Sequence, residues 1–256
     1  MEDWQERDLQ ADRIQQMYEE VEDELIALLV AALASQDDAT VAYAVARGKV
    51  LLASAQLATD EWNGEAIPEL YGKQVSISKP SIEAVTTASE GMFADMTATV
   101  GRRLDDLAAN FRVQQARWEA LAAFTAKRTG TRIGVRGISA DMQAHLRENG
   151  ITGFTDAAGR KWKLSTYADM AARTTTMNAQ LAGVKDRVVA RGDDLVNIIG
   201  PLDYPDGCPP SVLGGPYSIT GATTEYNGRP IMTLDEATSY YGVFHPRCRH
   251  SLAYAG

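Results

Sequence analysis

An apolar stripe near the N-terminus restricts the possible folds more than any other part of this sequence. From residue 14 to residue 32, apolar residues recur at alternating steps of four and three, which places them on one face of a helix. The members of the stripe are Ile14, Tyr18, Val21, Leu25, Leu28 and Ala32, with acidic residues around them. Such a helix must cover its apolar face, either with neighbouring helices in a bundle or with a partner protein. The chain is therefore predicted to begin with a packed helical region.

Good helix formers continue through most of the first half of the chain. Ser35-Gln36-Asp37-Asp38 predicts a cap for a second helix over residues 39–59, and Trp62-Asn63-Gly64 predicts a turn after it. Pro80 begins a stretch of one or two long helices that extends to Lys127. We expect this half to be almost wholly helical.

Glycines and prolines interrupt the second half. Three glycines between residues 130 and 137 predict a domain boundary, with a helical region over 1–130 and a smaller domain over 131–256. The smaller domain is expected to contain a β-hairpin around Gly159, a helix over 165–191, a buried strand over 195–199, a tight turn at Asn227-Gly228 and a last helix over 234–241. The predicted fold class is α+β, an elongated helical N-terminal region followed by a small mixed domain with short strands and Gly/Pro-rich loops.

Charge is distributed unevenly along the chain. Residues 1–38 contain twelve Asp or Glu against two Arg, a net charge of −10, whereas the whole chain carries −9. A basic band over residues 111–137 has a net charge of +5. Its cations are Arg112, Arg117, Lys127, Arg128, Arg132 and Arg136. The band is a candidate contact for DNA phosphates or an acidic partner, and the alternative is a solvated helix face.

Cysteine usage and hydropathy bear on location. Two cysteines and no charged-then-apolar leader favour a reducing compartment. No apolar run approaches the roughly 20 residues that a transmembrane helix needs. We expect a soluble protein with no membrane role of its own.

Ligand-type residues are concentrated at the end of the chain. Cys248 lies between His245 and His250, and Cys208 lies in a turn-rich stretch upstream. Sulfur and imidazole nitrogen are the ligands that tetrahedral zinc prefers, so these four residues are a candidate structural zinc site. The alternatives are a buried thiol pair or a disulfide. A catalytic metal site is not expected, because no His-Glu-x-x-His or comparable motif is present.

Several motifs of the second half together resemble a known family. They are Gly153-Phe154-Thr155-Asp156-Ala157-Ala158-Gly159-Arg160-Lys161-Trp162, Ser165-Thr166-Tyr167-Ala168-Asp169-Met170-Ala171-Ala172-Arg173-Thr174-Thr175-Thr176, Cys208-Pro209 and His245-Pro246-Arg247-Cys248-Arg249-His250. In this order they resemble the minor capsid protein 2 type of tailed-phage minor capsid proteins, which are related to the Mu F-like head morphogenesis proteins.

The resemblance implies a structural role in the phage head rather than a reaction. The implied partners are the portal, the major capsid protein and packaged DNA, with multiple copies in each particle. The implied location is the virion, in the capsid interior or portal region, after assembly in the host cytoplasm. The family commonly has Cys-x-x-Cys where this chain has Cys208-Pro209-Pro210-Ser211. Because a hydroxyl is a poorer zinc ligand than a thiolate, His250 would have to complete the ligand set.

Two other classes of function compete with this interpretation. The first is an enzyme, either a zinc-dependent hydrolase or a nucleotide-using transferase with Arg173 and the following threonines at its site. The sequence lacks the phosphate loop, nucleophile elbow or carboxylate pair that such enzymes need. Those threonines equally suit close packing, with hydroxyls bonded to the preceding turn of a helix. The second class is a DNA-contacting module built on the basic band.

Overall fold

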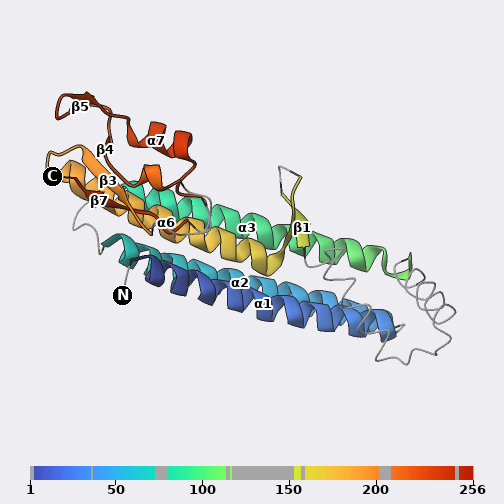
Figure 1. The fold of residues 1–256 in the computed structure, drawn as a ribbon. Helices are drawn as coiled ribbons and strands as arrows, with labels where there is room; N and C mark the ends of the chain where they lie inside the picture. Colours follow the sequence, from blue (N-terminus) through green and yellow to red (C-terminus); the bar gives the residue numbers. More distant parts are fainter. Residues whose placement is uncertain are drawn as a thin grey trace. The chain divides into compact units, whose positions relative to one another are not determined.

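The computed structural model describes residues 3–35, 37–72, 80–113, 116, 153–156, 159–201, 209–245 and 248–255. Its helices are α1 (Asp3–Ser35), α2 (Asp38–Gly72), α3 (Pro80–Ala109), α6 (Leu164–Ala190), α7 (Leu234–Tyr241) and the short η1 (Pro210–Val212). Its strands are β1 (Gly153–Thr155), β2 (Lys161–Lys163), β3 (Leu195–Ile199), β4 (Gly214–Ser218), β5 (Glu225–Tyr226), β6 (Arg229–Pro230) and β7 (Ser251–Tyr254). Long helices and short antiparallel strands confirm the α+β class (Figure 1).

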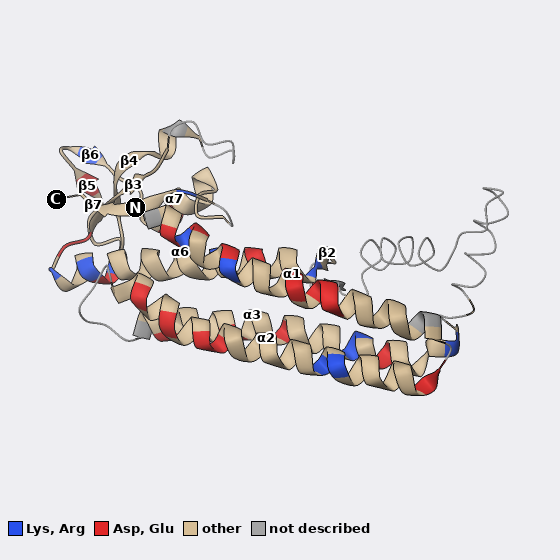
Figure 2. Ribbon diagram, turned by 90° about the horizontal axis from the view of Figure 1, so that it is seen from below, with Lys and Arg blue, Asp and Glu red and all other residues tan. Residues whose placement is uncertain are grey.

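The apolar stripe of α1 is covered within the protein. Ile14, Tyr18, Val21, Leu25 and Ala32 are all buried. Acidic residues recur along α1 outside this face (Figure 2, red). The stripe therefore stabilises the chain's own core, because each large apolar side chain removed from water contributes about 1.5–3 kcal/mol.

Helix α2 begins where the sequence predicts but continues much further. The Asp37 carboxylate accepts hydrogen bonds from the backbone N–H groups of Ala39 and Thr40, at 3.2 and 3.1 Å, which is an N-cap. The turn predicted at Trp62-Asn63-Gly64 is wrong, since α2 runs through it and through Pro68 to Gly72. Trp62, Ile67 and other residues of this stretch are buried, so tertiary packing overrides the local turn signal.

The described chain divides into two compact units, and α1, α2, α3 and α6 contribute residues to both. One comprises residues 1–14, 60–91 and 169–256, and the other comprises residues 15–59 and 92–168. The boundary predicted near residue 130 lies outside the described residues, so that domain division stays a prediction.

The second unit has a helical core and the β1–β2 hairpin. Tyr18 of α1 stacks on Phe93 of α3 with ring centroids 5.9 Å apart, and its hydroxyl shares a 3.1 Å hydrogen bond with Thr59 of α2. Strands β1 and β2 pair in antiparallel, as predicted. Gly159 between them has a φ of 80°, the left-handed conformation predicted for this loop.

In the first unit, α6 covers a small antiparallel sheet with the strand order β4-β3-β7. Its core consists of one face of α6 together with side chains from the sheet, α7 and the C-terminal segment. The members from α6 are Met177, Leu181, Val184 and Val188, and those from the sheet include Val196, Ile198, Tyr217 and Leu252. The spacing of four, three and four residues on α6 gives one helical face. This packing fixes the C-terminal segment against α6.

Local signals predicted several elements of this unit correctly. Strand β3 and helix α7 have the expected bounds, and Asn227 and Gly228 have positive φ between β5 and β6. Thr233 and Glu236 form a capping box at the start of α7. Among the helices that the structure describes, none combines the length and hydropathy needed to cross a bilayer.

Candidate functional site

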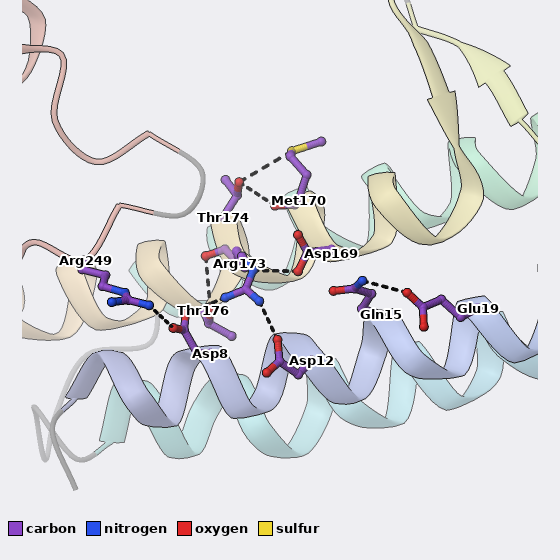
Figure 3. A network of polar contacts seen from close by, with 10 residues as sticks. All are labelled: Asp8, Asp12, Gln15, Glu19, Asp169, Met170, Arg173, Thr174, Thr176 and Arg249. Atoms are coloured by element: carbon purple, nitrogen blue, oxygen red, sulfur yellow. Dashed lines mark hydrogen bonds and ion pairs between the residues drawn. The ribbon is translucent and has the colours of Figure 1, made fainter. Parts of the chain in front are cut away.

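A cluster of charged side chains in the first unit surrounds Arg173 on α6. Its guanidinium donates from Nε to Asp169, from one terminal nitrogen to Asp8 and from the other to Asp12, at 2.6, 2.5 and 2.5 Å (Figure 3). Asp169 lies one turn earlier on α6, and Asp8 and Asp12 lie one turn apart on α1. We call these four residues the arginine clamp. All three guanidinium nitrogens therefore contact carboxylates, and the clamp fixes the first turns of α1 to α6.

Because Arg173 and Asp169 are largely shielded from water, their charges are stabilised mainly by their charged partners. The Arg173 side chain is 15% exposed and that of Asp169 only 1%. Burial by itself lowers the pKa of Arg173, but the carboxylates of Asp169, Asp8 and Asp12 outweigh it and raise the pKa above the usual value. The guanidinium is used to neutralise carboxylates. This geometry does not support the hypothesis that Arg173 holds a phosphate.

Arg249 makes a second connection to α1. Its guanidinium carbon lies 4.4 Å from the ring centroid of Trp4, a cation–π contact, and one of its nitrogens lies 3.9 Å from the Asp8 carboxylate. Trp4, Asp8 and Asp12 are spaced by four residues, so they share one face of α1. That face binds two arginines from the C-terminal part of the chain.

The threonines after Arg173 bond back to their own helix. Thr174 donates to the carbonyl of Met170 at 2.8 Å, and Thr176 donates to the carbonyl of Arg173 at 3.1 Å. Thr175 and Thr176 are buried. The packing interpretation of this run is therefore confirmed for Thr174 and Thr176.

The C-terminal motif brings together two of the four candidate zinc ligands. Cys248 Sγ lies 3.3 Å from His250 Nδ1, and both residues are buried. The backbone N–H of Cys248 donates to the carbonyl of His245 at 2.9 Å, which connects the backbone of these two residues. His250 packs closely on Gly200, where an added Cβ would come within 2.7 Å of the imidazole. Cys248 and His250 are thus part of the packed interior.

The distance between Cys248 Sγ and His250 Nδ1 is compatible with both atoms binding one zinc ion. Two ligand atoms of one tetrahedral zinc lie roughly 3.5 Å apart, close to the observed separation. Cys208 lies outside the described residues, and Ser211 is exposed on η1. Within the described part of the chain, no three His, Cys, Asp or Glu residues form a group that could hold a metal. The zinc site therefore stays a prediction.

Only one member of the basic band is described. The Arg112 side chain is 65% exposed and lies 3.0 Å from the Asp38 carboxylate. The other five cations, Arg117, Lys127, Arg128, Arg132 and Arg136, lie outside the described residues. A DNA or partner contact through this band is still a prediction.

Sequence reasoning missed the acidic half of the clamp. Asp8 and Asp12 were only members of an acidic segment, although their spacing with Trp4 marks a common face. Their partner follows 165 and 161 residues later, and local spacing holds no signal for that.

A family model matches the part of the chain that contains most of these residues. Residues 138–254 match the family model described as phage minor capsid protein 2. Over these residues, somewhat under half of the chain, the protein is similar to the phage minor capsid protein 2 family. The matched region contains α6 with Arg173, the sheet, α7 and the Cys248–His250 pair. No curated protein and no solved structure matches the chain.

The family match bears on the general function. Phage minor capsid proteins are structural components of the virion, so the match supports a structural role and a virion location. The family resemblance is thereby confirmed.

Proposed function

We propose that this chain is a phage minor capsid protein, that it acts in head assembly by binding, without catalysis, and that it lies in the capsid interior or portal region. Its partners would be the portal, the major capsid protein or both, and it would assemble with them in the host cytoplasm. The observation that carries the proposal is the family match over residues 138–254. The arginine clamp supports it, because Arg173 neutralises carboxylates rather than binding a substrate.

Particle composition tests this proposal most directly. We expect mass spectrometry of purified, nuclease-treated particles to detect the protein in several copies each, and chemical cross-linking to join it to the portal or the major capsid protein. The proposal would be contradicted if the protein were absent from purified particles and if particles assembled normally without it.

Contact with packaged DNA is a second part of the proposal. It rests on the +5 charge of residues 111–137, because clustered cations bind phosphates with release of counterions. We expect the purified protein to bind duplex DNA of any sequence with an affinity that falls steeply with salt. Charge reversal at Arg128 and Arg132 should weaken that binding, and no binding at low salt would remove this part.

A zinc clip is the proposed role of the Cys/His motif. Cys208, His245, Cys248 and His250 would hold the metal, which would connect two loops and contribute folding energy directly. We expect about one zinc per chain by elemental analysis and a lower melting temperature after chelation. Cys248→Ala should abolish both effects. A chain that is metal-free when purified with zinc in all buffers would instead leave Cys248 and His250 as a buried hydrogen-bonded pair.

A further inference from the structure

Helix α2 has a second apolar face that the described core does not use. Tyr43, Val50 and Leu57 are 63%, 52% and 61% exposed, and they recur every seven residues. Ala46 and Ala53, also exposed, lie between them at steps of three and four. All five belong to the same compact unit. We call them the α2 seam.

The other face of α2 is already buried. Val41, Ala44, Val45, Leu52 and Ala55 pack into the core of the unit. Successive helical residues are 100° apart, so the buried set and the α2 seam lie on opposite sides of the helix. A solvent-facing side of a helix is normally polar, and an exposed row of large apolar residues indicates an interaction surface.

We propose that the α2 seam binds the α2 seam of a second copy of this chain in antiparallel orientation. Along the helix the seam alternates large and small side chains, from Tyr43 through Ala46, Val50 and Ala53 to Leu57. When two such rows run in opposite directions, Val50 lies against Ala53 of the second copy and Leu57 lies against its Ala46. Val50 and Leu57 then each face an alanine, which allows close helix packing. A self-complementary surface of this kind suits a two-fold interface.

The charges beside the seam favour a second copy over DNA or a strongly charged partner. On one edge Arg47 pairs with Glu24 of α1 at 2.9 Å, and on the other Lys49 pairs with Asp105 of α3 at 2.5 Å. Each of these two pairs combines one cation with one anion. Antiparallel two-fold packing brings like edges together in reversed order, so in this register Lys49 of one copy can approach Asp105 of the other. The balanced edges neither repel an identical copy nor attract phosphates.

Sedimentation velocity of the full chain over a range of concentrations tests the proposal. We expect a reversible dimer. Val50→Glu or Leu57→Glu should weaken it roughly 100-fold, because every dimer then buries two unpaired carboxylates. Val189→Glu is the matched control, since Val189 is 46% exposed on α6 and outside the seam. Circular dichroism checks that each variant keeps its helices.

Cross-linking tests the orientation with substitutions that preserve the surface. Chains with Ala46→Cys and chains with Leu57→Cys, carrying different tags, are mixed and treated with a short thiol-specific reagent, with the parent chain as the blank. Antiparallel packing predicts mixed cross-links, whereas strong Leu57→Cys self-linking would indicate parallel packing and overturn the proposal. A chain that is monomeric at all concentrations, or a dimer insensitive to both glutamates, would overturn it as well. Binding of the seam to the portal instead of to itself would also do so.

Discussion

At the scale of single residues, Asp194 organises a loop that no sequence motif revealed. Its carboxylate accepts hydrogen bonds from the hydroxyls of Ser218 and Thr220 at 2.5 and 2.7 Å, and from the backbone N–H groups of Thr220 and Thr223 at 2.8 and 3.0 Å. Partial burial raises the pKa of Asp194, but these hydrogen bonds outweigh it and hold the pKa well below the usual range. The ionised carboxylate therefore stabilises residues 218–223.

The lowered pKa of Asp194 determines how the free energy of unfolding changes as the pH falls. Because the folded pKa lies below the unfolded value of about 3.9, the stabilisation is complete above that value and decreases as pH falls toward the folded pKa. We expect Asp194→Asn to lower the free energy of unfolding at pH 7 by about 1–3 kcal/mol, and to make the acid loss less steep. Urea titrations from pH 2.5 to pH 7 measure both effects. Asp95→Asn, at an exposed site on α3, is the control; equal acid slopes in parent and Asp194→Asn would contradict the assignment.

Two glycines should respond oppositely to the same substitution. A Cβ at Gly200 would come within 2.7 Å of the His250 ring and 3.1 Å of its Cα, so Gly200→Ala must displace the C-terminal motif. We expect a loss of about 1–3 kcal/mol in the free energy of unfolding. Gly64 lies inside α2 with nothing within 4 Å of an added Cβ, and Gly64→Ala should stabilise by about 0.5–1 kcal/mol. Thermal unfolding of both variants measures these changes. A gain in stability for Gly200→Ala would show that His250 is loosely packed.

At the scale of elements, the sequence correctly predicts the ends of a helix where residues within a few positions determine them. Helix α7 has its capping box at Thr233 and Glu236 and ends at a left-handed Gly242, so both ends are encoded within a few residues. Helix α2 behaves differently, because Asn63-Gly64 and Pro68 are local stop signals and burial of side chains such as Ile67 decides the outcome. Strands β4 and β7 were also missed, since each depends on pairing with β3.

The arginine clamp is a tertiary contact between elements, and its removal should be costly. Arg173→Met leaves the buried Asp169 carboxylate without its cation, so we expect the free energy of unfolding to fall by about 3–5 kcal/mol. Arg173→Lys should recover part of this loss, because an ammonium supplies charge without the planar guanidinium geometry. Arg47→Gln removes a surface pair whose side chains are 42% and 45% exposed, and it should cost less than about 1 kcal/mol. Urea unfolding at two salt concentrations measures all three, and similar losses for Arg173→Met and Arg47→Gln would show that the clamp contributes little.

At the scale of the whole molecule, the candidate site depends on contacts between residues that are far apart in the sequence, and local spacing does not predict such contacts. The C-terminal motif is visible in the sequence, because scarce Cys and His residues lie close together. Asp8 contacts Arg173 across 165 positions, and Tyr71 donates to Asp186 at 2.6 Å across 115. Only the folded chain brings these residues together. The family motifs therefore indicate the similarity of the C-terminal half to phage minor capsid proteins, whereas the structure adds that the first turns of α1 and the end of α2 help to hold it.

These long-range contacts predict that the two halves of the sequence depend on each other. In fragment 131–256, α6 would lose the α1 carboxylates around Arg173 and the cover over Ala171, Ala172 and Ala179, which are fully buried in the intact chain. The core between α6 and the sheet lies within this fragment, so we expect its strands to form. We also expect the fragment alone to self-associate through the uncovered face of α6, and to become a one-to-one complex when fragment 1–130 is added. Light scattering and circular dichroism on the separate and mixed fragments measure this. If fragment 131–256 is monomeric and unfolds cooperatively with unchanged stability, the boundary near residue 130 separates independent domains, and α1 contributes nothing to the stability of the C-terminal half.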